Sequence, residues 1–380
     1  MSAHQSLGGR VLTKPFLVLM AIWLIGSFYG IQRFFMDGMG AVSNLNGGYA
    51  WGIWVVYDVV VGTALACGGY ALAIALFVFH PGRYHPLVRS ALLASLLGYA
   101  MGGFGAFFDM GRFWQFYEIF LPKNWNFNAV MLEVGLCVAS YIIVLVLEFA
   151  PTLLERFGMR GMLKSLNRVL FFLIALGVLL PTMHQSSLGT LLINMGHKVH
   201  PLWQSWQLQP ILALTTALIM GFSIVVFEGS TSAVTFGRRS ESPLLAGLGK
   251  AIVGLLGFFM LVRIGGLLFQ GKLGLIFAGD LGSVMFILET ALFIVPLVVL
   301  AAPARRSQGS QLLVAAVSML LAGAMYRFNA FLITYDPGPG YSYFPSAPEI
   351  LITFSIIALE LMIYLVVVKT LPVLHREEHA

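Results

Sequence analysis

Three carboxylates interrupt apolar runs that are long enough to cross a bilayer, and they are Asp58, Glu133 and Glu289. A charge in hydrocarbon costs about 2.5–3.5 kcal/mol on insertion scales, and such residues face the inside of a helix bundle. There they form ion pairs or exchange protons with a bound molecule. Each of the three is therefore half of a structural pair or a candidate for proton-transfer chemistry.

Two basic residues also lie inside apolar runs, in the same layer as all three carboxylates. Arg263 and Arg327 lie at the depth expected for Glu289, so we expect structural ion pairs among these three, for example Arg327 with Glu289. Asp58 and Glu133 have no basic residue in their own runs and are the candidates for function. His184 follows Pro181 at the expected end of the fifth run and is a further candidate, for hydrogen bonding or proton transfer.

A polar stripe continues from Glu133. Cys137 and Ser140 share its helical face to within ~40° at 100° per residue. Two carboxylates joined across the bilayer would form a proton path, but small packing residues would leave the same pattern. The candidate path consists of Glu133, Tyr141, Glu148, Arg89 and Glu228.

Small residues surround two further candidates. Gly62, Ala66, Gly69 and Ala73 make small-xxx-small pairs after Asp58, so that carboxylate is expected to face a closely packed helix. Tyr99 stands among glycines, which either permit tight helix packing or leave room for a flat ligand. In the last run, Glu360 lies near the middle.

The elements that carry these residues are membrane helices. Of 380 residues, 59% are hydrophobic and 10% are charged, whereas soluble domains carry about 25% charged residues. The runs are continuous rather than alternating, which excludes barrel strands. We predict an all-α polytopic protein with one membrane domain over 1–380 and ten spans near 16–35, 52–79, 90–109, 127–150, 166–183, 209–230, 245–268, 281–302, 311–334 and 349–371.

The distribution of basic residues predicts the orientation of the spans. Fifteen of the 22 Lys and Arg residues fall on one side, in short loops and near the termini. This bias places both termini in the cytoplasm and the three carboxylates in the outer third of the bilayer. The net charge of +6 is explained in the same way, without nucleic acid. The outer loops are aromatic-rich, which fits an interfacial belt with membrane lipids or a docked partner.

The chain offers few ligands for metals. Cys67 and Cys137 stand alone in apolar runs, so no iron–sulfur cluster or zinc site is expected. The histidines, among them His80 and His184, are expected at the ends of spans or outside them. We therefore expect no haem, because b-type haem usually needs paired histidines inside helices.

Several long motifs resemble one known family. They include LNGGYAWGIWVVYD, YHPLVRSALLASLLGY, LEFAPTLLERFG and PGPGYSYFP. These motifs resemble HybB-type membrane subunits of periplasmic [NiFe] hydrogenases, in the NrfD/polysulfide-reductase membrane-subunit family. The resemblance runs from about Leu7 to Pro372.

The resemblance implies a quinone-reactive subunit in the inner (cytoplasmic) membrane of a bacterium. The implied partners are a ferredoxin-like four-cluster iron–sulfur subunit and the small and large [NiFe] hydrogenase subunits on the periplasmic side. The implied bound substrate is menaquinone or ubiquinone. The motifs WVVYD, VMLEVG and PTMHQSS place its site at Asp58, Glu133 and His184, with Tyr99 as a further catalytic candidate.

Hydrogen oxidation outside would then reduce the quinone, with protons taken from either side of the membrane. Protons from the cytoplasm would build a gradient, and protons from outside would leave turnover electroneutral. Two other functions stay open. One is an ion or proton transporter without redox partners, and the other is a passive anchor with the quinone site mainly on a partner.

Overall fold

The computed structural model describes residues 4–76, 83–237 and 242–375. Within them ten helices are long and apolar enough to cross a membrane, which confirms the all-α polytopic fold. Residues His80, Arg238, Arg239, Arg376 and His379 lie outside the described residues. The spans are Lys14–Asp37, Val55–Ile74, His85–Asp109, Val130–Arg156, Arg160–Lys198, Gln209–Thr235, Ser242–Phe269, Leu281–Ala301, Gly309–Ile333 and Ala347–Thr370.

Seven of these spans rest on one regular helix each, and three contain a π-helical segment. The regular helices are α5 (Val88–Asp109), α6 (Val130–Arg156), α7 (Arg160–Met195), α8 (Gln209–Thr235), α9 (Ser242–Phe269), α10 (Leu281–Ala301) and α13 (Ala347–Thr370). The others are α1 (Lys14–Gly26), η1 (Ser27–Ile31) and α2 (Gln32–Asp37); η3 (Val55–Gly62), α3 (Thr63–Leu65) and α4 (Gly68–Ile74); and α12 (Gly309–Phe328) with η12 (Asn329–Ile333).

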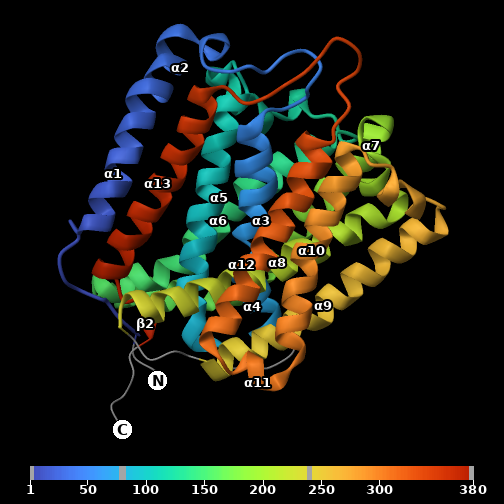
Figure 1. The fold of residues 1–380 in the computed structure, drawn as a ribbon. Helices are drawn as coiled ribbons and strands as arrows, with labels where there is room; N and C mark the ends of the chain where they lie inside the picture. The colour runs from blue at the N-terminus through green and yellow to red at the C-terminus, as the bar shows by residue number, and fades with distance from the viewer. Residues whose placement is uncertain (1–3, 77–82, 238–241, 376–380) are drawn as a thin grey trace.

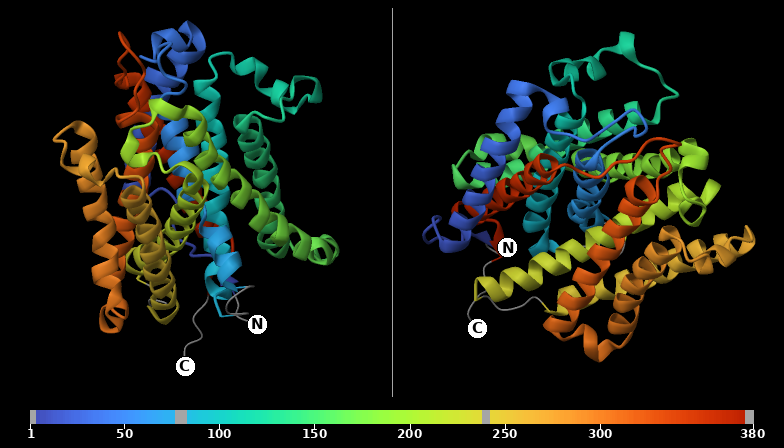
Figure 2. Two further views of the ribbon diagram at one scale, coloured as in Figure 1. Left: turned by 90° about the vertical axis from the view of Figure 1, so that its right-hand side faces the viewer. Right: turned by 45° about the horizontal axis from the view of Figure 1, so that its top comes forward.

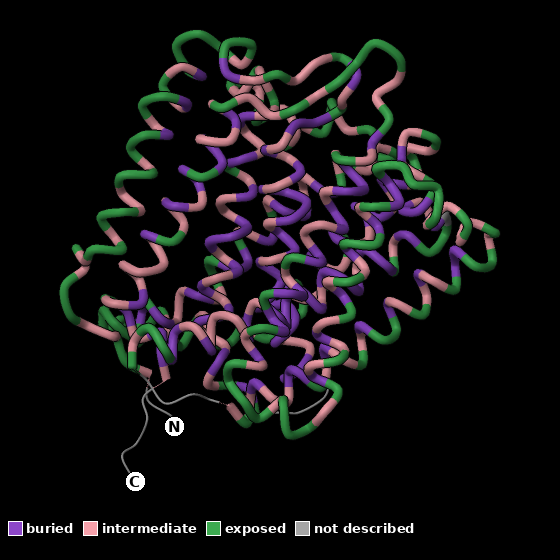
Figure 3. The backbone as a smooth tube through the Cα atoms, viewed as in Figure 1, coloured by how far each residue is buried: buried purple, intermediate pink, exposed green. Residues whose placement is uncertain are grey.

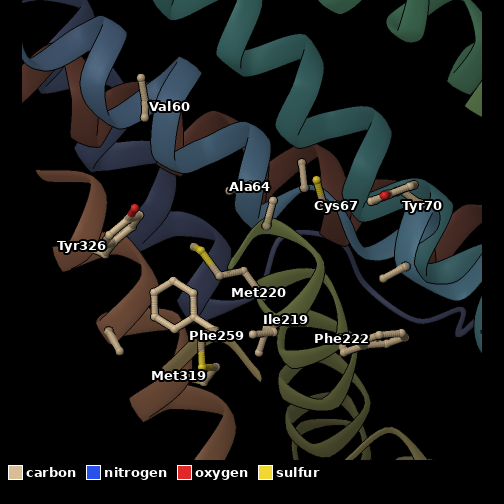
Figure 4. Packing of buried hydrophobic residues seen from close by; sticks show 14 of the residues in the cluster. Val60, Ala64, Cys67, Tyr70, Ile219, Met220, Phe222, Phe259, Met319 and Tyr326 are labelled. Atoms are coloured by element: carbon tan, nitrogen blue, oxygen red, sulfur yellow. The ribbon is translucent and has the colours of Figure 1, made fainter. Parts of the chain in front are cut away.

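Helix α8 lies at the centre of the bundle. It packs against α4, α7, α9 and α12, and α1 and α13 form a separate pair beside α5 (Figure 1). Buried residues concentrate in the central helices, whereas α1 is largely exposed along its length (Figure 3). In the core, Ala64 and Cys67 of the second span belong to one cluster of buried side chains with Met220 of α8 and Tyr326 of α12 (Figure 4).

Both described chain ends lie at one end of the bundle, which we call the termini end (Figure 1). There β1 (His4–Gln5) pairs antiparallel with β2 (Leu374–His375). The opposite end carries the long connections, and we call it the loop end. From it the segment with η6 (Phe113–Phe120) projects away from the helices (Figure 2).

The fifth span differs most from its predicted limits. Helix α7 continues through Pro181 to Met195, although the apolar run was expected to end at 183. A proline removes one backbone hydrogen bond, and membrane helices tolerate this loss because neighbouring groups satisfy the freed carbonyl. His184 therefore lies inside a helix and not at its end.

A buried ion pair joins α9, α10 and η12. Arg263 Nη1 donates to Glu289 Oε1, and both side chains are 1% exposed or less. The other carboxylate oxygen of Glu289 accepts from Trp203 Nε1 and Asn329 Nδ2, each at 2.8 Å. Phe286 packs against the guanidinium, with 4.5 Å from Arg263 Cζ to the ring centroid. Every oxygen of the carboxylate is thus satisfied, as a charge away from water requires.

Glu289 pairs with Arg263 and not with Arg327. Asn329, which bonds Glu289, is two residues beyond Arg327, so the two side chains point about 200° apart around the helix. Arg327 instead faces α7 and α8, where Nη2 donates to Gln185 Oε1 at 3.4 Å and to the Ala213 carbonyl at 3.2 Å. No ion pair forms on Arg327 among the described residues.

Removing one partner of the buried pair should destabilise the bundle strongly. Glu289→Ala leaves a buried guanidinium uncompensated, at a cost of about 3–5 kcal/mol. The double change Arg263→Met with Glu289→Leu removes both charges and should restore most of this loss. Thermal unfolding midpoints of the purified complex in detergent measure both variants. Equal destabilisation by the single and double changes would contradict this account.

Strand pairing at the termini end should depend on pH. Burial, and then the positive charges of Arg89, His375 and His85, lower the pKa of His4 to about 4, from the usual 6.5. Because the folded pKa is the lower one, its stabilising contribution is complete above pH 6.5 and is lost as the pH falls toward 4. Limited proteolysis of the N-terminal segment should be faster at about pH 5 than at about pH 7.5. His4→Gln should abolish the difference, and a difference that persists would assign it to another group.

Candidate functional site

Asp58 lies on the π-helical segment η3 of the second span. Hydrogen bonds in a π-helix join residue i to i+5, a rare geometry that recurs at functional sites. The side chain is 4% exposed, and its Oδ2 has no hydrogen-bond partner among the described residues. A buried polar oxygen without a partner costs free energy. Asp58 is therefore the strongest candidate for a group that meets a ligand.

Glycines on α5 make room for Asp58. A Cβ atom on Gly105 would lie 2.0 Å from Asp58 Oδ2, and one on Gly102 would lie 2.7 Å from the Asp58 carbonyl oxygen. One turn further along α5, a Cβ on Gly98 would lie 2.6 Å from Ala66 Cβ. These glycines thus permit close helix packing. They also leave room, because Gly98 and Gly102 line a cavity.

The cavity has a volume of about 390 Å³ and lies between spans one, two, three, six and ten. Its walls are mainly apolar, and three carboxylates line it: Asp58, Glu228 and Glu360. Along α8 and its C-cap it extends from Ile224 to Phe236, which is ~18 Å at ~1.5 Å per residue. Ligand sites in proteins are typically ~300–1,000 Å³ with few polar groups. The cavity therefore suits a long, mostly apolar molecule that meets a carboxyl group at one end.

A hydrogen-bond network lies behind the cavity wall. Thr63 Oγ1 is 2.9 Å from His184 Nε2 and accepts from Gln185 Nε2 at 3.1 Å. Gln185 Oε1 in turn accepts from Arg327. His184 is 1% exposed, and its Nδ1 has no partner among the described residues. The network ties α7 and α12 to the second span five residues after Asp58.

Two tyrosines extend this network. Tyr99 Oη lies 3.7 Å from Cys67 Sγ, where the second span is interrupted between α3 and α4. The Tyr99 ring meets Tyr141 edge-on, with centroids 4.6 Å apart, and His184 with centroids 5.9 Å apart. The structure thus gathers Tyr99, Tyr141 and His184, but behind the cavity and not in its lining.

Other predicted site residues lie elsewhere. Helix α6 begins at Val130, so Glu133 stands in its first turn, where it is exposed, and it does not line the cavity that holds Asp58. Glu148 packs on α7, since a Cβ on Gly177 would lie 2.7 Å from its Oε1. Arg89 forms an ion pair with Glu155 at 2.7 Å. Of the predicted proton path, Glu228 alone lines the cavity.

Sequence reasoning missed Thr63 and Gln185. Gln185 could have been found from the sequence, because it adjoins His184 in the motif PTMHQSS. Thr63 could not have been found in this way. It is five residues after Asp58, which is about 140° away on a regular helix at 100° per residue. The π-helical geometry brings such positions close to one turn apart.

Comparison with known proteins identifies three relatives. No family model matches the chain. It is 46% identical over 374 residues to the "Probable Ni/Fe-hydrogenase 2 b-type cytochrome subunit" of Escherichia coli (strain K12), covering 97% of this chain and 95% of the relative. A protein of Nitratidesulfovibrio vulgaris is 30% identical over 387 residues, or 98% and 97% of the two chains. The "Menaquinone reductase, integral membrane subunit" of the same organism is 23% identical over 192 residues, or 47% and 44%.

The comparison corrects the prediction that this chain carries no haem. The Escherichia coli relative is named a b-type cytochrome subunit, which implies haem. The prediction rested on histidines lying at or beyond the span ends, and α7 carries His184 well inside a span. His184 is the only fully buried histidine among the described residues, and it does not line the cavity. These residues do not form a paired-histidine haem site, so no catalytic step is assigned to haem.

Filling the space beside Asp58 should disturb the site. Gly105→Ala would place a methyl group on the carboxylate, and overpacking of this kind costs about 1–3 kcal/mol. Gly103→Ala is the matched control, because its nearest contact would be an ordinary 3.5 Å to Ile142 Cδ1. The thermal midpoint of the complex should fall for Gly105→Ala alone. Equal midpoints for the two variants would show that α5 does not pack so tightly on Asp58.

Proposed function

Because this chain belongs to the HybB-type membrane subunits of [NiFe] hydrogenases, within the NrfD-type family, we propose that it reduces a membrane quinone with electrons from hydrogen. It is a multi-span membrane subunit of a redox complex with hydrogenase partners. One relative is named a menaquinone reductase subunit, which supports a quinone as the oxidant. The observation that carries the proposal is the Asp58 carboxyl oxygen that lies beside an apolar cavity and has no partner among the residues that the structure describes.

Reduction of a quinone to hydroquinone consumes two electrons and two protons. The head group binds at the end of the cavity where Asp58 lies, and the apolar tail lies against the apolar residues of the walls. Asp58 bonds a quinone oxygen and transfers the proton, as a positioned carboxyl group does in general acid catalysis. Its Oδ2 is free to do so, because no described group occupies it.

The residues behind the wall act as positioning residues. Thr63 holds His184 and Gln185, and Tyr99 contacts Cys67 at the break in the second span. These contacts fix the π-helical turn that directs Asp58 at the cavity. Glu133 has no part in the proposed site, because it is exposed in the first turn of α6.

The redox partners are proposed to dock at the loop end, on the periplasmic side of an inner membrane. They are a four-cluster iron–sulfur subunit and the small and large hydrogenase subunits. Exposed aromatic side chains on η6 support a docking surface there, since Trp114 is 59% exposed and Phe116 and Tyr117 are also exposed. Electrons then enter near the end of the cavity that holds Asp58.

Quinone reduction is proposed to be coupled to proton transfer across the membrane. Hydrogen oxidation releases protons at the loop end, while the quinone takes its protons from the termini end. The extension of the cavity from Asp58 to Glu228 supports this direction. Each hydrogen molecule oxidised then adds to a proton gradient.

Replacing the Asp58 carboxyl should stop quinone reduction without affecting hydrogen oxidation. Asp58→Asn keeps the shape of the side chain but provides no acid, and loss of general acid catalysis costs ~10²–10⁴ in rate. Hydrogen-driven reduction of a soluble quinone analogue by the whole complex measures the effect. Reduction of a viologen dye at the partner clusters should stay at the wild-type rate.

Asp280→Asn is the matched control for this carboxyl-to-amide change. Asp280 is an exposed N-cap of α10 that accepts from the Ser283 amide at 2.7 Å, and it does not line the cavity. Its replacement should leave quinone reduction unchanged. Wild-type quinone reduction by Asp58→Asn would instead favour a passive anchor with the quinone site on a partner.

A further inference from the structure

One face of α8 lines the cavity with polar groups. Glu228, Thr231, Ser232 and Thr235 are spaced i, i+3, i+4 and i+7, so they lie on one side of the helix, and all four line the cavity. Thr235 is the last residue of α8, at the termini end. The Thr231 hydroxyl donates to the Phe227 carbonyl, which leaves its oxygen available to accept from water. A polar stripe thus leads inward from the termini end.

Helix α13 continues this stripe toward the loop end. Glu360 and Tyr364 are one turn apart, ~6 Å along the axis, and both line the cavity. Tyr364 Oη donates to Glu228 Oε1 and so joins the polar face of α13 to that of α8. Glu360 is the next carboxyl beyond this contact on the way to Asp58.

Two glycines of α5 mark the distance that remains between Glu360 and Asp58. Glu360 Oε1 lies 3.6 Å from the position of a Cβ on Gly98, and Asp58 Oδ2 lies 2.0 Å from that of a Cβ on Gly105. Seven residues separate these glycines, which is ~10 Å along the helix. Gly98 and Gly102, which lie within this interval, line the cavity. At ~30 Å³ per molecule, the whole cavity has room for on the order of ten waters, or for a quinone head group that spans the gap.

The stripe predicted on α6 lacks such a shared space. Glu148 packs against Gly177, and neither Glu148 nor Tyr141 lines the cavity that holds Asp58. Ser140 of that stripe is exposed on the outside of the bundle. The two candidate routes therefore differ in one property, which is access to the buried Asp58 carboxyl.

We propose that Glu360 carries protons from the termini end to Asp58, by way of the α8 stripe and the Tyr364–Glu228 contact. This rests on the proposed function, because the protons serve quinone reduction at Asp58. Two electrons arrive from the partner clusters, and Asp58 delivers two protons in turn. Each proton that leaves Asp58 is replaced through Glu360, so both carboxyl groups end each turnover as they began.

The test uses the complete complex in proteoliposomes with its hydrogenase subunits facing outward. Hydrogen drives reduction of a quinone analogue, and a trapped pH dye follows alkalinisation of the lumen. Glu360→Gln should slow alkalinisation by ~10²-fold or more, the lower end of the range expected for loss of a proton-transfer group. Viologen reduction should stay at the wild-type rate. Glu360→Asp, which keeps an acid, should recover part of the loss, and Tyr364→Phe should fall in between.

Alkalinisation at the wild-type rate in Glu360→Gln would overturn the proposal. So would an equal loss in Glu360→Asp and Glu360→Gln with lowered thermal midpoints, because that result marks a packing role. Loss of alkalinisation with quinone reduction retained supports the route, since protons then enter from the loop end. Asp280→Asn again serves as the control. If Asp58→Asn abolishes quinone reduction while Glu360→Gln behaves as wild type, the proposed quinone site at Asp58 is supported and only proton transfer through Glu360 is wrong.

Discussion

The close approach of α5 to the second span determines where the chemistry of this protein can occur. At Gly105 the backbone comes so near Asp58 that a single methyl group would occupy the position of the carboxyl oxygen. Gly98 and Gly102 of the same row line the cavity that Asp58 and Glu360 share. From the sequence, the glycines indicated either tight helix packing or room for a ligand. In the structure both follow from the absence of side chains on one face of α5. A backbone without side chains packs closely where it meets another helix and leaves space where it does not.

The buried carboxyl groups in the two halves of the bundle differ in how many hydrogen-bond partners they have. In the second half, Glu289 receives bonds from Arg263, Trp203 and Asn329, so its charge is fully compensated. In the first half, Asp58 keeps an oxygen without a partner in the part of the chain that the structure describes. Compensation makes a carboxylate a structural element, because any change leaves an unpaired charge in a medium without water. An uncompensated carboxyl group can exchange its proton, and this difference separates the structural site from the proposed catalytic site.

The predictions that failed share one physical origin, which is the position of helix ends and the rotation of helix faces. Pro181 was expected to end the fifth span, yet α7 continues to Met195 and buries His184, so the premise that every histidine lies at or beyond a span end was wrong. Glu133 was expected inside the bundle, but α6 begins only three residues before it and turns it outward. Arg327 was expected to pair with Glu289, but Asn329 points to Glu289 instead, because two residues around a helix reverse direction. A hydropathy average covers whole helical turns, so it does not distinguish helix ends or helix faces.

The sequence by itself determined the number of spans, the helical class and the family, because each depends on long runs of residues or long motifs. Span number follows from the cost of placing polar backbone in hydrocarbon, which every residue of a run shares. The sequence also shows that Asp58 has no basic residue in its own span. Only the tertiary structure decided which carboxyl groups share a cavity, since Asp58, Glu228 and Glu360 come from three helices far apart in the chain. Their meeting depends on the tilt and rotation that each helix adopts against its neighbours, and no local pattern encodes that geometry.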